Sequence, residues 1–191
     1  MTTREELYFK SAEDWRSWLL KNHTISGGVY LILYKVNSNK PSMRWEEAVR
    51  VALCFGWIDS TVKRLDDERR RQLFTPRKPK SAWSKLNKTH IQELIANGKM
   101  HESGFLKIQT AKEDGSWTAL DTVEDLIIPE DLQIEFDKHP LAFKNYNQFS
   151  KSYKKGYLYW LYSGKKQATR TKRITEIIRL CELNIKARTS Y

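Results

Sequence analysis

The chain has 191 residues, of which 40% are hydrophobic and 12% aromatic, and this composition excludes a mostly disordered protein. No run approaches the roughly 18 apolar residues of a membrane span. The acidic, polar start is not a secretory signal, so we expect a cytoplasmic protein. The net charge of +11 is concentrated in residues 63–88 and 150–191, which flank an acidic stretch. These basic blocks either form one surface for nucleic acid, anionic lipid or a phosphorylated ligand, or are a solvated exterior that partly pairs with the acidic stretch.

The first third of the chain predicts two helices with a strand between them. Ser11 with an acid three residues later is typical of a helix N-cap, and it predicts a helix that ends near Asn22. Residues 29–36 are rich in branched and aromatic side chains and nearly all apolar, which predicts a central, buried strand. Apolar residues recur at helical spacing over residues 45–55, and Gly56 should end that helix.

A hairpin and another helix should follow. Residues 58–62 and 72–75 are expected to pair as antiparallel strands, with the acidic residues 66–68 near the tip. No tight-turn dipeptide fixes their register. A helix is predicted over residues 83–97, and Gly98 suits the left-handed position that follows a helix.

The remainder is predicted to be mainly helical. We expect a short helix over 101–112, a turn at Asp114 and Gly115, an extended segment over 117–120, and helices after Pro129 and over 141–149, 154–161 and 168–187. The whole pattern predicts an α+β fold: a small, mostly antiparallel sheet flanked by helices, with a helical C-terminal extension. An α+β body over 1–115 and a helical region over 116–191 packed on it are expected, or one single domain.

Metal binding, cofactor binding and nucleophilic catalysis have no sequence signature. The four histidines are far apart, and no Cys-x-x-Cys or His-Glu-x-x-His spacing occurs, so we predict no metal and no cofactor. Cys54 and Cys181 lie on or near apolar helix faces, which favours small buried hydrophobic residues over reactive thiols. No Gly-x-Ser-x-Gly motif is present, so we predict no catalytic residues and favour a protein that is not an enzyme.

The best-supported candidate site is an aromatic and basic pocket around the hairpin. Strand alternation and the start of the following helix, whose free amides favour an anion, bring its members together. The residues that form it are Trp57, Phe74 and Trp83 as walls and Asp59, Arg77, Ser84 and Asn87 as the polar edge. This pocket would bind an unknown small anionic ligand or a protein partner. As an alternative, the protein is an enzyme and the pocket binds its small anionic substrate. The competing interpretation is that the tryptophans are core and that Asp59 pairs with Arg77 to fix the hairpin.

A second candidate is a nucleic-acid surface near the C-terminus, with basic residues to bind phosphates and aromatic residues to stack on bases. The basic residues are Lys165, Lys166, Arg170, Lys172 and Arg173. The aromatic ones are Tyr157, Trp160 and Tyr162. The alternative is a charged outer face opposite an isoleucine stripe.

Several spaced motifs together resemble the YdeI/OmpD-associated family of bacterial proteins. They lie at residues 52–59, 74–77 and 81–87, and in the tail at residues 129–132 and 168–174. The resemblance implies a bacterial cytoplasmic protein linked to bacteriocin or stress tolerance that binds a ligand or partner. It implies no reaction and carries over no catalytic residue.

Overall fold

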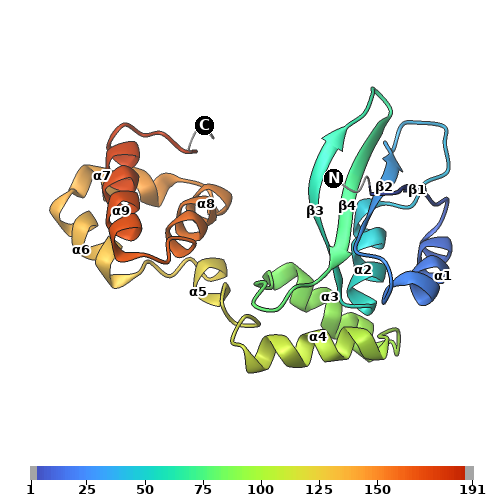
Figure 1. The fold of residues 1–191 in the computed structure, drawn as a ribbon. Helices are drawn as coiled ribbons and strands as arrows, with labels where there is room; N and C mark the ends of the chain where they lie inside the picture. Colours follow the sequence, from blue (N-terminus) through green and yellow to red (C-terminus); the bar gives the residue numbers. More distant parts are fainter. Residues whose placement is uncertain (1–3, 188–191) are drawn as a thin grey trace. The chain divides into compact units, whose positions relative to one another are not determined.

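The computed structural model describes residues 4–187, which divide into two compact units, one ending at Thr118 and one beginning at Ala119 (Figure 1). The N-terminal unit contains a four-stranded sheet and helices, and the C-terminal unit is helical. This confirms the predicted α+β class with its helical C-terminal part.

The sheet is built from β1 (Glu6–Tyr8), β2 (Val29–Tyr34), β3 (Trp57–Arg64) and β4 (Arg69–Pro76), in the order β1-β2-β4-β3. β1 pairs with β2 in parallel, and the other pairs are antiparallel. The apolar strand β2 lies inside the sheet, as predicted. The strand β1 was not predicted, because three residues carry too little pattern to distinguish a strand from a loop.

The predicted hairpin is confirmed, and its strands are longer than expected. Trp57 pairs with Pro76 and Asp59 pairs with Phe74, and the register shifts between Asp59 and Val62. Beyond this shift the ladder continues through the charged residues near the tip, because exposed charged side chains do not prevent backbone pairing.

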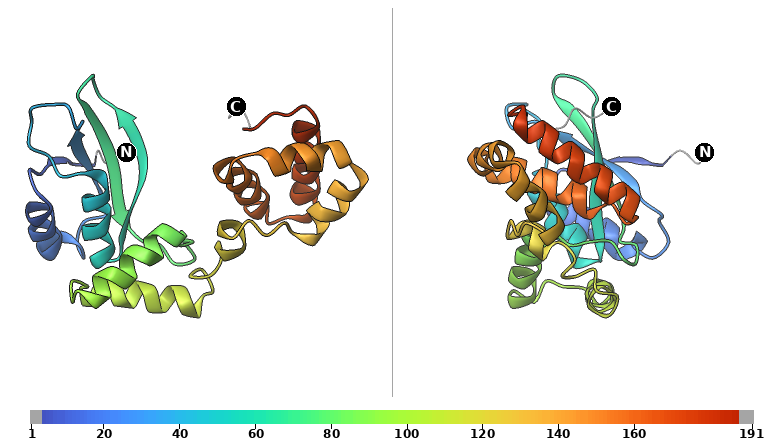
Figure 2. Two further views of the ribbon diagram at one scale, coloured as in Figure 1. Left: turned by 180° about the vertical axis from the view of Figure 1, so that it is seen from behind. Right: turned by 90° about the vertical axis from the view of Figure 1, so that its left-hand side faces the viewer.

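Helices α1 (Ala12–Asn22) and α2 (Trp45–Cys54) pack against one face of the sheet (Figures 1 and 2). Ser11 caps α1, because its Oγ accepts a hydrogen bond from the Asp14 amide at 3.2 Å. After α2, Gly56 adopts φ 72°, a left-handed conformation that favours glycine. The core on this face contains Trp15, Leu19, Leu31, Leu53, Trp57 and Phe74.

Helices α3 (Lys85–Ala96) and α4 (Glu102–Glu113) lie at the end of the sheet where β3 begins and β4 ends (Figure 1). Gly98 has φ 62°, which confirms its predicted role after α3. Gly104 is buried against the Cys54 carbonyl at the end of α2, where no side chain fits. This close approach fixes α4 beside the end of the hairpin, where the candidate site lies.

Two predictions after α4 were wrong. Residues 117–120 form turns and not an extended segment, because the Trp117 amide folds back to donate to the Ala111 carbonyl at 2.9 Å. The last helix ends at Glu182 instead of residue 187, and Asn184 follows with φ 54°. Its sequence pattern continues past the point where the backbone turns.

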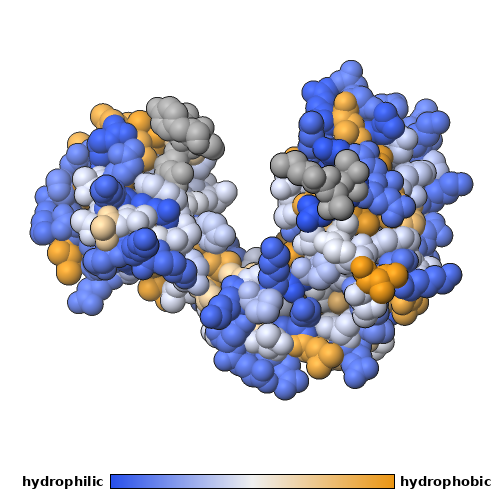
Figure 3. Space-filling view, viewed as in Figure 1, coloured by the Kyte–Doolittle hydropathy of each residue, from blue (hydrophilic) through white to orange (hydrophobic). Residues whose placement is uncertain are grey.

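The C-terminal unit consists of α5 (Asp121–Glu124), α6 (Glu130–Lys138), α7 (Pro140–Gln148), α8 (Lys151–Tyr162) and α9 (Gln167–Glu182). The four-residue helix α5 was not predicted, whereas the four longer helices occupy the predicted regions. An aromatic cluster links α6, α7 and α8 through Phe136, Tyr146, Phe149 and Tyr157. Hydrophilic side chains cover most of the visible surface, and the hydrophobic patches are small and separate (Figure 3).

Candidate functional site

The end of β4 places Arg77 inside the N-terminal unit. Its amide donates to the Gly56 carbonyl at 2.9 Å, which extends the pairing of the hairpin by one step. The residue is 4% exposed, and its guanidinium carbon lies 3.5 Å from the centre of the Trp83 ring. Nη1 donates to the Ala82 carbonyl at 3.3 Å, whereas the buried Nε has no partner. Arg77 is therefore a buried cation that is stacked on an indole and only partly hydrogen-bonded.

Asp59, the expected partner of Arg77, forms its hydrogen bonds with other residues. The Asp59 carboxylate accepts hydrogen bonds from Trp45 Nε1 at 2.9 Å and from Gln72 Nε2 at 3.0 Å. Within residues 4–187, no carboxylate lies within ion-pair distance of Arg77. Burial lowers the pKa of Arg77 to about 10, and the more distant charge of Asp59 opposes the shift. The side chain therefore remains charged at neutral pH without its own counter-ion.

Arg77 lines a small cavity between the loop after β4 and helix α4. The cavity volume is about 10 Å³, which is close to the room that one water molecule needs. The residues around it include Arg77, Lys78, Lys80, Trp83, Lys107, Thr110, Asp114 and Ser116. Four of these carry positive charge and one carries negative charge, so the surroundings of the cavity favour an anion.

Asp114 holds the loop and the end of α4 together. Its Oδ2 accepts from the Lys80 amide at 2.7 Å, and its Oδ1 accepts from the Ser116 amide at 2.9 Å. Hydrogen bonds from Ser116, and then from Lys80, lower the pKa of Asp114. Lys80 has φ 61°, a left-handed conformation that is uncommon for a residue with a side chain. Both Asp114 oxygens thus have backbone donors, and the carboxylate shapes the loop.

The other predicted pocket residues do not line this cavity. Trp57 and Phe74 belong to the buried cluster under α1 and α2, where the Trp57 ring contacts Trp15 at 6.2 Å between centres. Ser84 is the N-cap of α3, because its Oγ accepts from the Asn87 amide at 3.2 Å. Of the predicted set, the structure brings Arg77 and Trp83 together at the cavity.

The residues from α4 were missed at the sequence level. Lys107, Ala111 and Asp114 recur at helical spacing, which is a signal that they share one face. The spacing does not predict that this face of α4 lies against the end of β4. The position of α4 depends on the contact between Gly104 and the end of α2.

A larger cavity of about 430 Å³ lies among α1, α2 and α3. Its arginines already have partners: Arg16 donates to the Lys99 carbonyl at 3.0 Å, and Arg50 lies 2.6 Å from the Glu93 carboxylate. Cys54 borders it but is 1% exposed, and burial raises the pKa of its thiol. Such a thiol is a poor nucleophile at neutral pH. Cys181 is also buried and unpaired, which confirms the prediction for both cysteines.

The predicted nucleic-acid residues in the C-terminal unit have mixed surroundings. Arg170 makes two hydrogen bonds to Asp131, at 2.5 and 2.8 Å. Arg173 donates to the Trp160 carbonyl and to Ser163 Oγ, the latter at 2.7 Å. Lys165, Lys166 and Lys172 are exposed, and the ammonium of Lys165 lies 4.3 Å from the centre of the Tyr162 ring. Two of the five cations therefore connect parts of the unit itself.

Residues 4–187 contain no group of three or more histidine, cysteine, aspartate or glutamate side chains placed to hold a metal ion. Within the same range, no helix is both long enough and apolar enough to span a membrane.

Two family models match different parts of the chain. Residues 125–184 match the model described as Bacteriocin-protection, YdeI or OmpD-Associated, which confirms the family resemblance for the region of α6 to α9. The motifs at residues 52–59, 74–77 and 81–87 fall within the other match, which covers residues 7–107. Comparison with curated proteins found no match, and neither did comparison with solved structures. The C-terminal unit carries a YdeI/OmpD-associated region. Because the match over residues 7–107 spans more than half of the sequence, the chain belongs to the family described as Domain of unknown function (DUF8412).

Proposed function

We propose that this protein is a binding protein whose N-terminal unit takes a small anion at the Arg77 cavity. The observation that carries the proposal is a guanidinium that is 4% exposed, stacked on Trp83 and without a carboxylate partner. Burying an ion costs several kcal/mol after relaxation, and a stacked indole returns only about 2 kcal/mol. A bound anion would supply the missing countercharge.

The size of the cavity limits the ligand. A volume of about 10 Å³ accepts a monatomic anion such as chloride, or a single oxygen of a carboxylate or phosphate that enters from the surface. Lys78, Lys80 and Lys107 lie around the cavity and would contact the outer part of a larger anion. The unsatisfied Arg77 Nε is a donor for the atom that enters.

The biological setting is part of the same proposal. The match of residues 125–184 to the model for bacteriocin protection supports a role in bacteriocin tolerance. That this role is exercised in the cytoplasm of a bacterium, and that it extends to other stress, belongs to the proposal itself. The test is survival of bacterial cells that produce the wild type or the Arg77→Met variant during bacteriocin challenge. Equal survival of both would show that the Arg77 cavity is not needed for bacteriocin tolerance.

The direct test is thermal and chemical unfolding with chloride, formate and phosphate at constant ionic strength, which a bulky anion maintains. An anion at 100 times its Kd should stabilise the wild type by about 2.7 kcal/mol. Arg77→Met keeps most of the apolar stem and removes the charge, so the variant should fold and lose this response. Preference for chloride would indicate an enclosed anion, preference for formate would indicate a carboxylate that enters with one oxygen, and preference for phosphate would indicate an anion that bridges to the lysines.

The matched control is Arg64→Met, because Arg64 lies near the exposed tip of the hairpin and pairs with Asp67. This control should respond to anions as the wild type does. If no anion stabilises the wild type, or if Arg77→Met keeps the response, the proposed function is wrong.

A further inference from the structure

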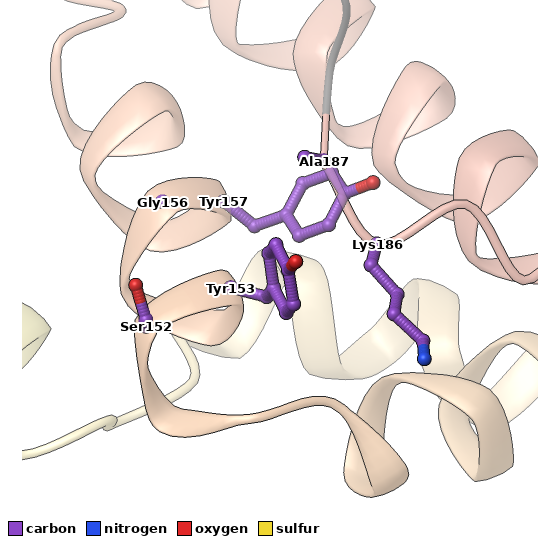
Figure 4. A pocket seen from close by; sticks show the side chains of 6 residues that line it. All are labelled: Ser152, Tyr153, Gly156, Tyr157, Lys186 and Ala187. Carbon is purple, nitrogen blue, oxygen red and sulfur yellow. The ribbon is translucent and has the colours of Figure 1, made fainter.

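A separate cavity of about 260 Å³ lies in the C-terminal unit, between α8 and the segment that follows α9. The residues that line it are Ser152, Tyr153, Gly156, Tyr157, Lys186 and Ala187. Figure 4 shows the two tyrosine rings between α8 and the segment that carries Lys186. The volume is slightly below the roughly 300 Å³ at which pockets for drug-sized ligands begin, so the cavity suits a ligand with one ring.

The walls of this cavity are fixed on one side and open on the other. The Tyr157 hydroxyl donates to the Ile185 carbonyl at 2.7 Å, and the Tyr157 ring stacks with Phe149, with 6.2 Å between centres. Tyr153 is 41% exposed, so a large part of this residue is accessible to a ligand. A Cβ at Gly156 would meet no atom within 4 Å, so this position leaves space beside the rings.

The described residues that line the cavity carry a net positive charge. Lys186 is the charged residue among the described residues that line it, and no carboxylate lines it within residues 4–187. Tyr153 and Ser152 add hydroxyl groups that can donate to an oxygen. Aromatic rings provide stacking surfaces, and an ammonium provides a counter-ion.

We propose that this cavity binds a small aromatic carboxylate, with the ring against the exposed Tyr153, the carboxylate at Lys186 and the buried Tyr157 as part of the fixed wall behind it. Stacking on Tyr153 selects a planar ring, and the lysine selects the anionic form. This binding is independent of the Arg77 cavity, which belongs to the other unit.

The experiment is calorimetric titration of the full chain with benzoate, in the Arg77→Met background so that the carboxylate cannot bind at the other cavity. Acetate supplies the charge without the ring, and benzyl alcohol supplies the ring without the charge. Benzoate should bind more tightly than either. Equal binding of acetate, or no binding of benzoate, would overturn the proposal.

Variants in the same background locate the site. Gly156→Leu fills the cavity while it favours the helix, so it should weaken benzoate at least tenfold without loss of the fold. Tyr153→Ala should weaken benzoate by about two- to tenfold, whereas Tyr159→Ala, an exposed tyrosine on the same helix that does not line the cavity, should not. Lys186→Met should weaken benzoate by about two- to fivefold. If Gly156→Leu does not fold, the comparison of Tyr153→Ala with Tyr159→Ala tests the location of the site. Equal affinities of these two variants for benzoate would refute the assignment of the site to this cavity.

Discussion

Replacing Gly104 by alanine should destabilise the N-terminal unit. A Cβ at this position would lie 2.9 Å from the Cys54 carbonyl carbon, closer still to its oxygen, and 2.8 Å from Met100 Cε. Ordinary contacts begin near 3.4 Å, so the carbonyl has to recede by more than about 0.5 Å. A backbone carbonyl moves less easily than the end of a flexible methionine.

The size of the effect follows from three terms. Overpacking of this kind costs about 1–3 kcal/mol. The Cys54 carbonyl also accepts from the His101 amide at 3.1 Å, and weakening that hydrogen bond costs up to about 1 kcal/mol. Alanine returns at most about 1 kcal/mol of helix propensity. We expect a net loss of about 1–3 kcal/mol in the free energy of unfolding.

The matched control is Gly156→Ala, because Gly156 lies inside helix α8 and a Cβ there meets nothing within 4 Å. The same substitution should stabilise the C-terminal unit by about 0.5–1 kcal/mol. Denaturant unfolding followed by far-UV circular dichroism measures both variants. Tryptophan fluorescence reports mainly on the N-terminal unit, which holds every tryptophan except Trp160.

Gly104→Ala should also weaken anion binding, because α4 carries Lys107 and Asp114 to the Arg77 cavity. If Gly104→Ala is as stable as the wild type, α4 does not approach the end of α2 as closely as described, and the position of the cavity residues on α4 would have to be revised.

Three further predictions concern ionisable groups. Burial, followed by the charges of His23 and Arg16, lowers the pKa of His101 below its ordinary value of 6.5, so the unfolded chain binds more protons between the two values. The free energy of unfolding should therefore fall as the pH decreases through about 6.5. It should fall less in the His101→Asn variant, in which the asparagine keeps a capping acceptor for α4. Equal pH profiles of the wild type and the variant would contradict this prediction. Burial raises the pKa of Cys181 to about 12, so a thiol reagent should label this residue only after denaturation, as mass spectrometry can show; rapid labelling of the native protein would refute its burial. Hydrogen bonds from Arg170 lower the pKa of Asp131, so their contribution is present above about pH 3.8 and is lost as the pH falls through the lower folded-state value. Arg170→Met should cost about 0.5–1 kcal/mol at pH 7, and this cost should shrink as the pH falls below 3.8, measured by denaturant unfolding over a pH series. A cost that stays constant over the whole series would exclude the ion pair as its cause.

The sequence predicted well those features whose causes are local. The Ser11 cap, the strand β2, the helix end before Gly56 and the left-handed Gly98 each depend on a few neighbouring residues. The burial of both cysteines follows from helical periodicity. The strand β1 and the turns at residues 117–120 were not predicted, because pairing with distant chain decides the first and a hydrogen bond to the end of α4 decides the second.

The candidate site shows the same division. From the sequence alone, the hairpin and the start of α3 indicated that Arg77 and Trp83 lie in one region, and the amino acid types indicated a cation beside an aromatic ring. Only the tertiary structure decided that Asp59 is held by Trp45 and Gln72, which leaves Arg77 buried without a carboxylate. Only the docking of α4 at Gly104 adds Lys107 to the cavity. The local sequence pattern determines which residues form a helix or a strand. The charge around a buried side chain depends instead on which distant elements pack against it. This packing depends on the shapes of whole surfaces, and no short sequence pattern contains that information.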